Sequence, residues 1–146
     1  MRTSCGATPW RDACVAVGMP TTVAEIMNPK LLYIREGDRL SLARVQILKF
    51  GVTAVPVLDE AHRPVGVVSL RDLAGEDHRV EASRPAKTVS GDATIEEGAR
   101  VLVEAGVHHL VVVDGEGVAV GMVSALDLVR AFVGVPPQHP ASFERY

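Results

Sequence analysis

The stretch "GVTAVPVLDEAHRPVGVVSLRDL", Gly51 to Leu73, decides the fold because its pattern recurs as "GVHHLVVVDGEGVAVGMVSALDL", Gly106 to Leu128. The two copies align without a gap at a spacing of 55 residues, which pairs Ser69 with Ser124. Helix capping alone explains one Ser-x-x-Asp motif, but it does not explain why so many other positions match. The sequence therefore predicts a duplicated structural unit.

The apolar pattern of each unit predicts short strands and helices in the order β-α-β-β-α. Predicted strands lie at residues 31–34, 54–59 and 65–70, and again at 88–89, 110–114 and 118–124; predicted helices lie at 22–27, 40–50, 72–74, 95–105 and 127–133. Val-rich strands need cover on both faces, and a unit of this size buries too little surface alone. We therefore expect an α+β fold in which two β-α-β-β-α repeats pack through their sheets with pseudo-twofold symmetry.

Composition shifts suggest where these units begin and end. We expect a poorly patterned N-terminal extension at 1–18, repeat 1 at 19–79, repeat 2 at 80–137 and a C-terminal tail at 138–146, with a polar linker at 74–85. Cys5 and Cys14 lie in the extension, and two cysteines without a nearby histidine are too few for a structural zinc site. We expect them to be reduced thiols.

Composition also excludes several classes of partner. Aromatic residues make up 4% of the chain and the net charge is −3, which argues against nucleic-acid binding. No apolar run approaches the length of a membrane span, and the N-terminus lacks the apolar centre of a signal peptide. We therefore expect a cytoplasmic protein with no membrane contact.

The paired motifs resemble the cystathionine-β-synthase (CBS) domain over residues 22–133. "GVTAVPVLD" followed by "GVVSLRD" fits the family pattern in full, and "GVHHLVVVD" with "GMVSALD" fits except that Val111 stands where the first unit has Pro56. CBS domains work as tandem pairs, called Bateman modules, which bind adenosine-containing ligands such as AMP, ADP, ATP or S-adenosylmethionine in clefts between the repeats. The resemblance also implies a homodimer that regulates a separate protein, often in energy sensing.

The resemblance assigns the residues of two nucleotide-binding clefts. The first cleft would combine Leu32, Tyr33, Val52, Thr53 and Ala54 with Ser124 and Asp127. The second would combine Thr88, Val89, Val107, His108, His109 and Leu110 with Ser69 and Asp72, and Arg71 would reach a phosphate.

Physical chemistry agrees with the aspartate assignment. A carboxylate accepts from two neighbouring ribose hydroxyls in charge-assisted hydrogen bonds, and the first turn of a helix keeps it ionised. Leu126 stands at the position equivalent to Arg71, so we expect the first cleft to lack a cation and the second to favour a phosphorylated ligand. His108 and His109 do not suit one metal ion, because adjacent strand residues point to opposite faces.

Two functions remain open at this point. The first is a stand-alone regulatory module that senses an adenine nucleotide, requires no metal and signals to a partner protein. The alternative is a ligand-free structural dimerisation module, which the missing proline at Val111 favours. We expect no enzymatic activity, because neither cysteine has a histidine partner in a known local signature and the chain has no phosphate-binding glycine loop.

Overall fold

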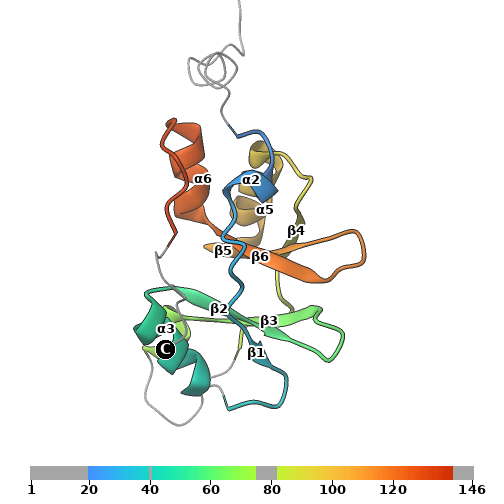
Figure 1. The fold of residues 1–146 in the computed structure, drawn as a ribbon, viewed down its shortest axis with the longest axis vertical. Coiled ribbons are helices and arrows are strands. Elements are labelled where there is room, and N and C mark those ends of the chain that lie inside the picture. The colour runs from blue at the N-terminus through green and yellow to red at the C-terminus, as the bar shows by residue number, and fades with distance from the viewer. Residues whose placement is uncertain (1–19, 40, 75–81, 140–146) are drawn as a thin grey trace, which may run out of the picture.

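Two three-stranded sheets lie face to face with helices outside them (Figure 1). The computed structural model describes residues 20–39, 41–74 and 82–139, so the expected extension, both cysteines and most of the linker and tail lie outside it. The first repeat contains β1 (Ile34–Arg35), α3 (Ser41–Phe50), β2 (Ala54–Leu58), β3 (Pro64–Ser69) and α4 (Leu70–Leu73). The second contains β4 (Thr88–Ser90), α5 (Ile95–Ala105), β5 (His109–Val113), β6 (Ala119–Ser124) and α6 (Ala125–Phe132), and α2 (Val23–Ile26) precedes both. Among the helices in these ranges, none has both the length and the apolar character needed to cross a bilayer.

The sheets repeat one another in register. Each has one parallel and one antiparallel strand pair, in the orders β1-β2-β3 and β4-β5-β6. Ile34 pairs with Val57 as Val89 pairs with Val112, and an irregularity follows Val57 and Val112 alike. The predicted α+β fold of two β-α-β-β-α repeats is confirmed.

Each sheet turns one face to its own helices. In the first repeat, Val55 and Val57 of β2 pack with Ile47 of α3 in one buried cluster. Successive strand residues point to opposite faces, so Pro56 lies on the face turned to the other sheet, as does its counterpart Val111. Both side chains are almost fully buried, which shows that the sheets pack closely on one another. The position that departs from the family pattern is therefore an inter-sheet packing position.

Some element boundaries differ from the predicted ones. Helices α4 and α6 begin directly after Ser69 and Ser124, because these serines are the N-caps and the aspartates stand at N3. Strand β1 begins at Ile34, later than predicted, because only Ile34 and Arg35 pair with β2.

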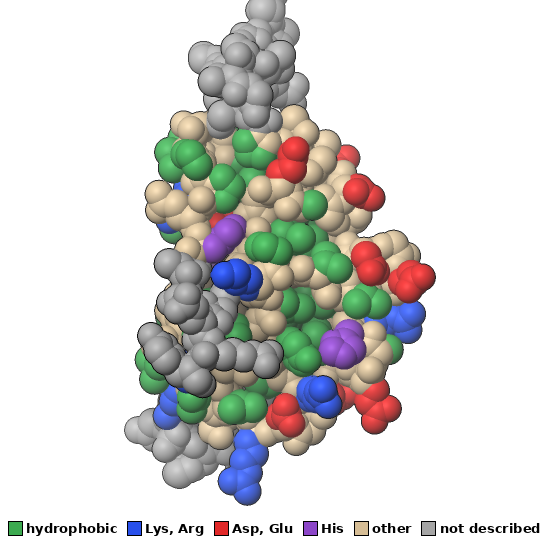
Figure 2. All heavy atoms as spheres, in the orientation of Figure 1, with side chains coloured by type: hydrophobic (Ala, Val, Ile, Leu, Met, Phe, Trp, Pro, Cys, Tyr) green, Lys and Arg blue, Asp and Glu red, His purple; other side chains and the backbone are tan. Residues whose placement is uncertain are grey.

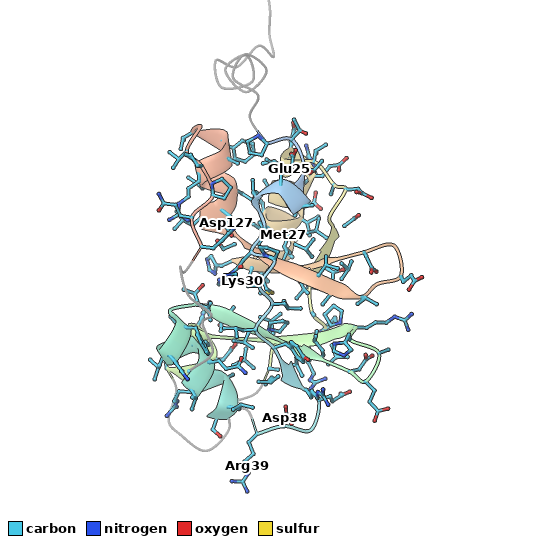
Figure 3. The ribbon with its side chains drawn as sticks, in the orientation of Figure 1. Glu25, Met27, Lys30, Asp38, Arg39 and Asp127 are labelled. Carbon is cyan, nitrogen blue, oxygen red and sulfur yellow. The ribbon has the colours of Figure 1, made fainter. Side chains whose placement is uncertain are left out.

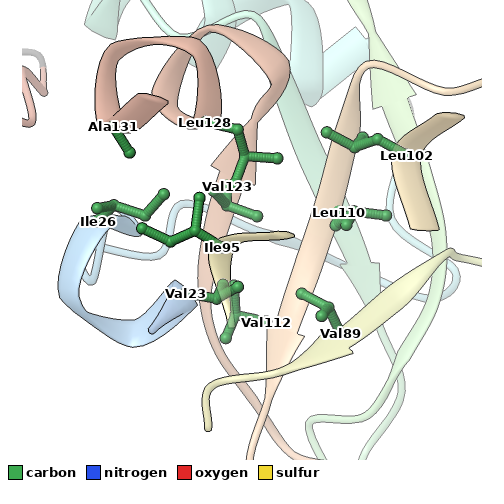
Figure 4. Packing of buried hydrophobic residues seen from close by; sticks show 10 residues of the cluster. All are labelled: Val23, Ile26, Val89, Ile95, Leu102, Leu110, Val112, Val123, Leu128 and Ala131. Carbon is green, nitrogen blue, oxygen red and sulfur yellow. The ribbon is translucent and has the colours of Figure 1, made fainter. Parts of the chain in front are cut away.

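The leading helix α2 packs on the second repeat rather than on the first. Val23 and Ile26 are fully buried among Ile95, Leu128 and other residues of the second core (Figure 4). The Val23 N–H donates to the Ala93 carbonyl at 2.9 Å, which ties the start of α2 to the turn before α5.

The segments that precede the two repeats each add to the other repeat's sheet. Asn28 exchanges backbone hydrogen bonds of 2.8 and 3.1 Å with Met122 on the edge of β6. Ser83, at the equivalent position, exchanges bonds of 2.8 and 3.0 Å with Val67 on the edge of β3. Each repeat is thus completed by chain that leads into the other one.

We call this pairing of each leading segment with the other repeat's edge strand the crossing. It explains why a glycine opens each Gly-apolar-apolar-Ser motif. A Cβ atom at Gly121 would lie 2.6 Å from Met27 Sδ and 2.8 Å from the Asn28 carbonyl oxygen. At Gly66 it would lie 3.1 Å from the Ser83 carbonyl oxygen. Only glycine lets the leading segment approach this closely at both places.

We expect Gly121→Ala to lower the free energy of unfolding by about 1–3 kcal/mol, because backbone must move to admit the new methyl group. Gly66→Ala should cost less, since its contacts are longer. Gly115→Ala, at a turn glycine with open space around it, is the control and should stay within about 0.5 kcal/mol of wild type. Denaturant unfolding measures all three, and equal stability of Gly121→Ala and Gly115→Ala would contradict the packing argument.

Candidate functional site

Two clefts open along the boundary between the repeats, as predicted from the resemblance. Cleft one holds about 640 Å³ of empty space, part of it open to solvent. Its walls bring together expected residues of both repeats: Leu32, Val52, Thr53, Ala54, Ser124 and Asp127. The first four come from the first repeat and the last two from the start of α6.

Cleft two is the larger, with about 1080 Å³ of empty space, and it too is open to solvent. Its expected residues are Ser69, Arg71 and Asp72 from the first repeat and Val107, His108 and His109 from the second. The cavity volume that compares with known ligand sites is about 400 Å³ in cleft two, which lies within the range typical of sites for small ligands, and about 140 Å³ in cleft one, which lies below it.

The other expected residues lie outside both clefts. Tyr33 turns away from cleft one and meets His62 edge-on, with ring centroids 5.6 Å apart. Val89 and Leu110 belong to the second core. Thr88 is exposed on β4, whereas its neighbour Lys87 lines cleft two. Lys87 is the residue 55 positions after Leu32, so the repeat register points to Lys87 rather than to Thr88.

Cleft one contains cationic side chains that the sequence analysis missed. Lys30 and Arg130 both line it, so the expectation that this cleft lacks a cation is wrong. Figure 3 shows Lys30 and Asp127 close to the boundary between the repeats, whereas Arg39 points away at the far end. Arg130 could have been found, because it lies one helical turn after Asp127. Lys30 could not, because its position depends on the crossing of the leading segment.

Asp127 is held rigidly at the start of α6. Its Oδ2 accepts from the Ser124 N–H at 2.8 Å, and its own N–H donates to Ser124 Oγ at 3.2 Å. Oδ1 lies 3.7 Å from Arg130 Nη1. The residue is only 8% exposed, so its carboxylate is fixed in direction and its charge is partly balanced.

Asp72 is held in the same way at the start of α4. Its Oδ2 accepts from the Ser69 N–H at 2.7 Å and from Ser69 Oγ at 3.0 Å. Within the described ranges, no residue donates a hydrogen bond to Oδ1 of Asp72, so that oxygen is available to a ligand.

Cleft two is the more cationic. Arg71, Arg84 and Lys87 line it beside the single aspartate of its motif. Arg84 also forms an exposed ion pair with Glu36 at 3.2 Å, so part of its charge is already balanced. Arg71 and Lys87 remain as the cations best suited to an anionic group.

Thr53 and His109 line both clefts and form a wall between them. Thr53 Oγ1 and His109 Nε2 share a hydrogen bond of 2.6 Å. Burial lowers the pKa of His109, the neighbouring His108 lowers it further, and Asp127 opposes both effects. The imidazole is therefore neutral at pH 7. Among the described residues, no group of three or more His, Cys, Asp or Glu side chains is arranged to hold a metal ion.

The match to a known family agrees with this geometry. The CBS domain matches the chain twice, at residues 23–79 and 76–134, which together span most of the sequence. The chain belongs to the CBS-domain family and carries two of these domains as a tandem pair.

Curated relatives are distant. An uncharacterized 17.7 kDa protein of Acidianus ambivalens is 23% identical over 125 residues, which cover 80% of this chain and 76% of that protein. YtoI of Bacillus subtilis, also uncharacterized, is 27% identical over 123 residues, 80% of this chain but only 28% of YtoI.

Solved structures show the same fold. CBSX2, crystallised in complex with AMP, is 26% identical, with a TM-score of 0.67 over 79% of this chain and 98% of its own. The CBS domain pair of MJ0100, in complex with 5′-methylthioadenosine and S-adenosyl-L-methionine, is 23% identical, with a TM-score of 0.71 over 78% and 97%. The second likeness supports the fold alone.

The lowered pKa of His109 predicts a pH dependence of stability. The unfolded chain takes up this proton near pH 6.5, whereas the folded protein takes it up only at lower pH. Between the two values the unfolded state binds more protons, so the free energy of unfolding falls as the pH drops below 6.5 and levels off below the folded pKa. Urea unfolding between pH 5 and pH 8 should show a shallower decline for His109→Gln than for wild type. Parallel curves would refute this role of His109.

Proposed function

We propose that this protein is a regulatory module that binds an adenosine-containing ligand in the clefts between its CBS repeats and acts on a separate partner protein. One observation carries the proposal. Asp72 and Asp127 are each fixed by a serine cap at a helix start, and each lines a cleft whose opposite wall comes from the other repeat. The paired carboxylates are thus displayed where the repeats meet.

The cleft walls match the parts of an adenosine. Ribose carries two neighbouring hydroxyls, which can donate to one carboxylate in charge-assisted hydrogen bonds. In cleft one, Leu32, Val52 and Ala54 offer apolar surface to a purine. The complex of CBSX2 with AMP makes adenosine the ligand class to test first.

Cationic side chains in both clefts make a phosphorylated ligand the better candidate. Arg71 and Lys87 stand in cleft two, and Lys30 and Arg130 stand in cleft one. Because Arg130 is already engaged with Asp127, we assign the stronger phosphate preference to cleft two.

A second candidate function is that of a structural dimerisation module. The apolar side chains exposed on the outer helices favour it. Leu48 of α3 and Val103 of α5, which occupy equivalent positions in the two repeats, are 73% and 81% exposed. Val129 of α6 and Val133, the C-cap residue that follows it, add further apolar surface. We infer that a second copy of the chain covers these helices, so that the ligand-binding module is itself a homodimer. The face drawn in Figure 2 also shows apolar side chains running across the boundary between the repeats.

Ligand binding is tested by isothermal titration calorimetry with AMP, ADP, ATP and S-adenosylmethionine. We expect Asp72→Ala to weaken binding in cleft two and Asp127→Ala to weaken binding in cleft one. The lost hydrogen bonds to a charged group are worth about 1.5–3 kcal/mol, which weakens the affected site roughly 10- to 150-fold. Asp72→Asn and Asp127→Asn can keep the helix cap while removing the charge, so they separate binding from folding.

Asp92→Ala, at an exposed turn outside both clefts, is the matched control and should bind as wild type does. If wild-type protein that is folded binds none of the four ligands, the regulatory proposal is wrong and the structural module is the better account.

The homodimer is tested by sedimentation velocity. The double variant Leu48→Asp/Val103→Asp should sediment as a monomer, because two charges in an apolar interface are costly to desolvate. Ala61→Asp, which adds a charge at the exposed turn after β2, should leave the dimer intact. A monomeric wild type, or a double variant that remains dimeric, would overturn the assignment of this surface.

A further inference from the structure

Thr53 and His109 form a partition that belongs to both clefts at once. Thr53 lies in the first repeat directly before β2, and His109 opens β5 in the second. The 2.6 Å bond between their side chains therefore joins the two repeats at the point where the clefts are closest.

The backbone connects this partition to both aspartate motifs. The N–H of Leu70, the first residue of α4, donates to the Thr53 carbonyl at 3.0 Å. His109 is the register partner of Ser124, and the N–H of Ala125, the first residue of α6, donates to the carbonyl of His108 at 2.8 Å. The helix starts that hold Asp72 and Asp127 are thus linked through one side-chain hydrogen bond.

The link has no symmetric copy. A shift of 55 residues turns Thr53 into His108 and relates His109 to Ala54. Alanine has no side-chain donor or acceptor, so the equivalent bond between His108 and Ala54 cannot form. One hydrogen bond therefore joins two residues that each line both clefts.

We propose that the Thr53–His109 bond couples the two clefts, so that a nucleotide bound in one changes the affinity of the other. This inference rests on the proposed function. A ring nitrogen makes one hydrogen bond at a time, so a ligand that takes His109 Nε2 or turns the ring changes the wall that the second ligand meets. Coupling between two sites requires that occupation of one site changes the surface that the other ligand contacts. A change in the His109 hydrogen bond or ring orientation is such a change.

The coupling is measured by titrating the protein with AMP and, separately, with ATP. Asp72→Ala weakens cleft two and Asp127→Ala weakens cleft one by roughly 10- to 150-fold, so each variant, titrated over the range that fills its intact cleft, gives the affinity of that cleft alone. The coupling factor is the overall two-site constant of wild type divided by the product of the two single-site constants. We expect it to differ from one by about fivefold or more.

Substitutions at Thr53 and His109 test whether the coupling depends on the hydrogen bond between them. Thr53→Val keeps the shape and removes the hydroxyl, and it should bring the factor to about one when the same three titrations are repeated in its background. Thr53→Ser keeps the hydroxyl and should keep the coupling. Thr88→Val, the same exchange at an exposed position outside both clefts, should behave as wild type. His109→Phe keeps an aromatic ring without Nε2 and gives a second test should Thr53→Val fold poorly.

Each outcome decides a separate point. If the titrations show two occupied clefts with a coupling factor of one, or only one occupied cleft, the coupling proposal is wrong and the proposed function stands. Coupling that survives in both Thr53→Val and His109→Phe overturns its assignment to this bond. Absence of binding to the folded wild type overturns both the coupling and the proposed function.

Discussion

The structure depends on the backbone pairing of each leading segment with the edge strand of the other repeat. Asn28 on β6 and Ser83 on β3 make equivalent pairs of hydrogen bonds, and Gly121 and Gly66 provide the space for them. The same crossing carries Lys30 into cleft one and Lys87 into cleft two. Neither cleft is complete without chain from both repeats, so folding of the pair and formation of the sites are one event.

The sequence predicted the fold well because the fold rests on local patterns. Residues that are 55 positions apart occupy equivalent places in the two sheets, so the repeat spacing predicts which strand residues correspond. The capping boxes place Asp72 and Asp127 at helix starts. The cleft residues were predicted less completely. Residues such as Lys30 reach a cleft only through contacts between segments far apart in the sequence, and local sequence patterns do not indicate such contacts. Tyr33 adjoins a cleft residue in sequence, yet its ring meets His62 outside cleft one.

The two clefts share one plan but differ in chemistry. Asp127 is buried and paired with Arg130, whereas Asp72 is more exposed and lines its cleft together with Arg71 and Lys87. Duplication gives both clefts the same carboxylate, and divergence at neighbouring positions gives each its own charge. The Thr53–His109 bond is another such difference, because Ala54, at the position equivalent to His109, cannot form its counterpart. The two proposed ligand sites therefore differ in charge and in the exposure of their carboxylates.

A crystal structure of the protein grown with AMP tests the central claim most directly. We expect AMP between the repeats, with its ribose hydroxyls within hydrogen-bond distance of the Asp72 or Asp127 carboxylate and its purine against the apolar wall of the same cleft. AMP bound away from both carboxylates, or both clefts filled by the protein's own side chains at saturating AMP, would contradict it.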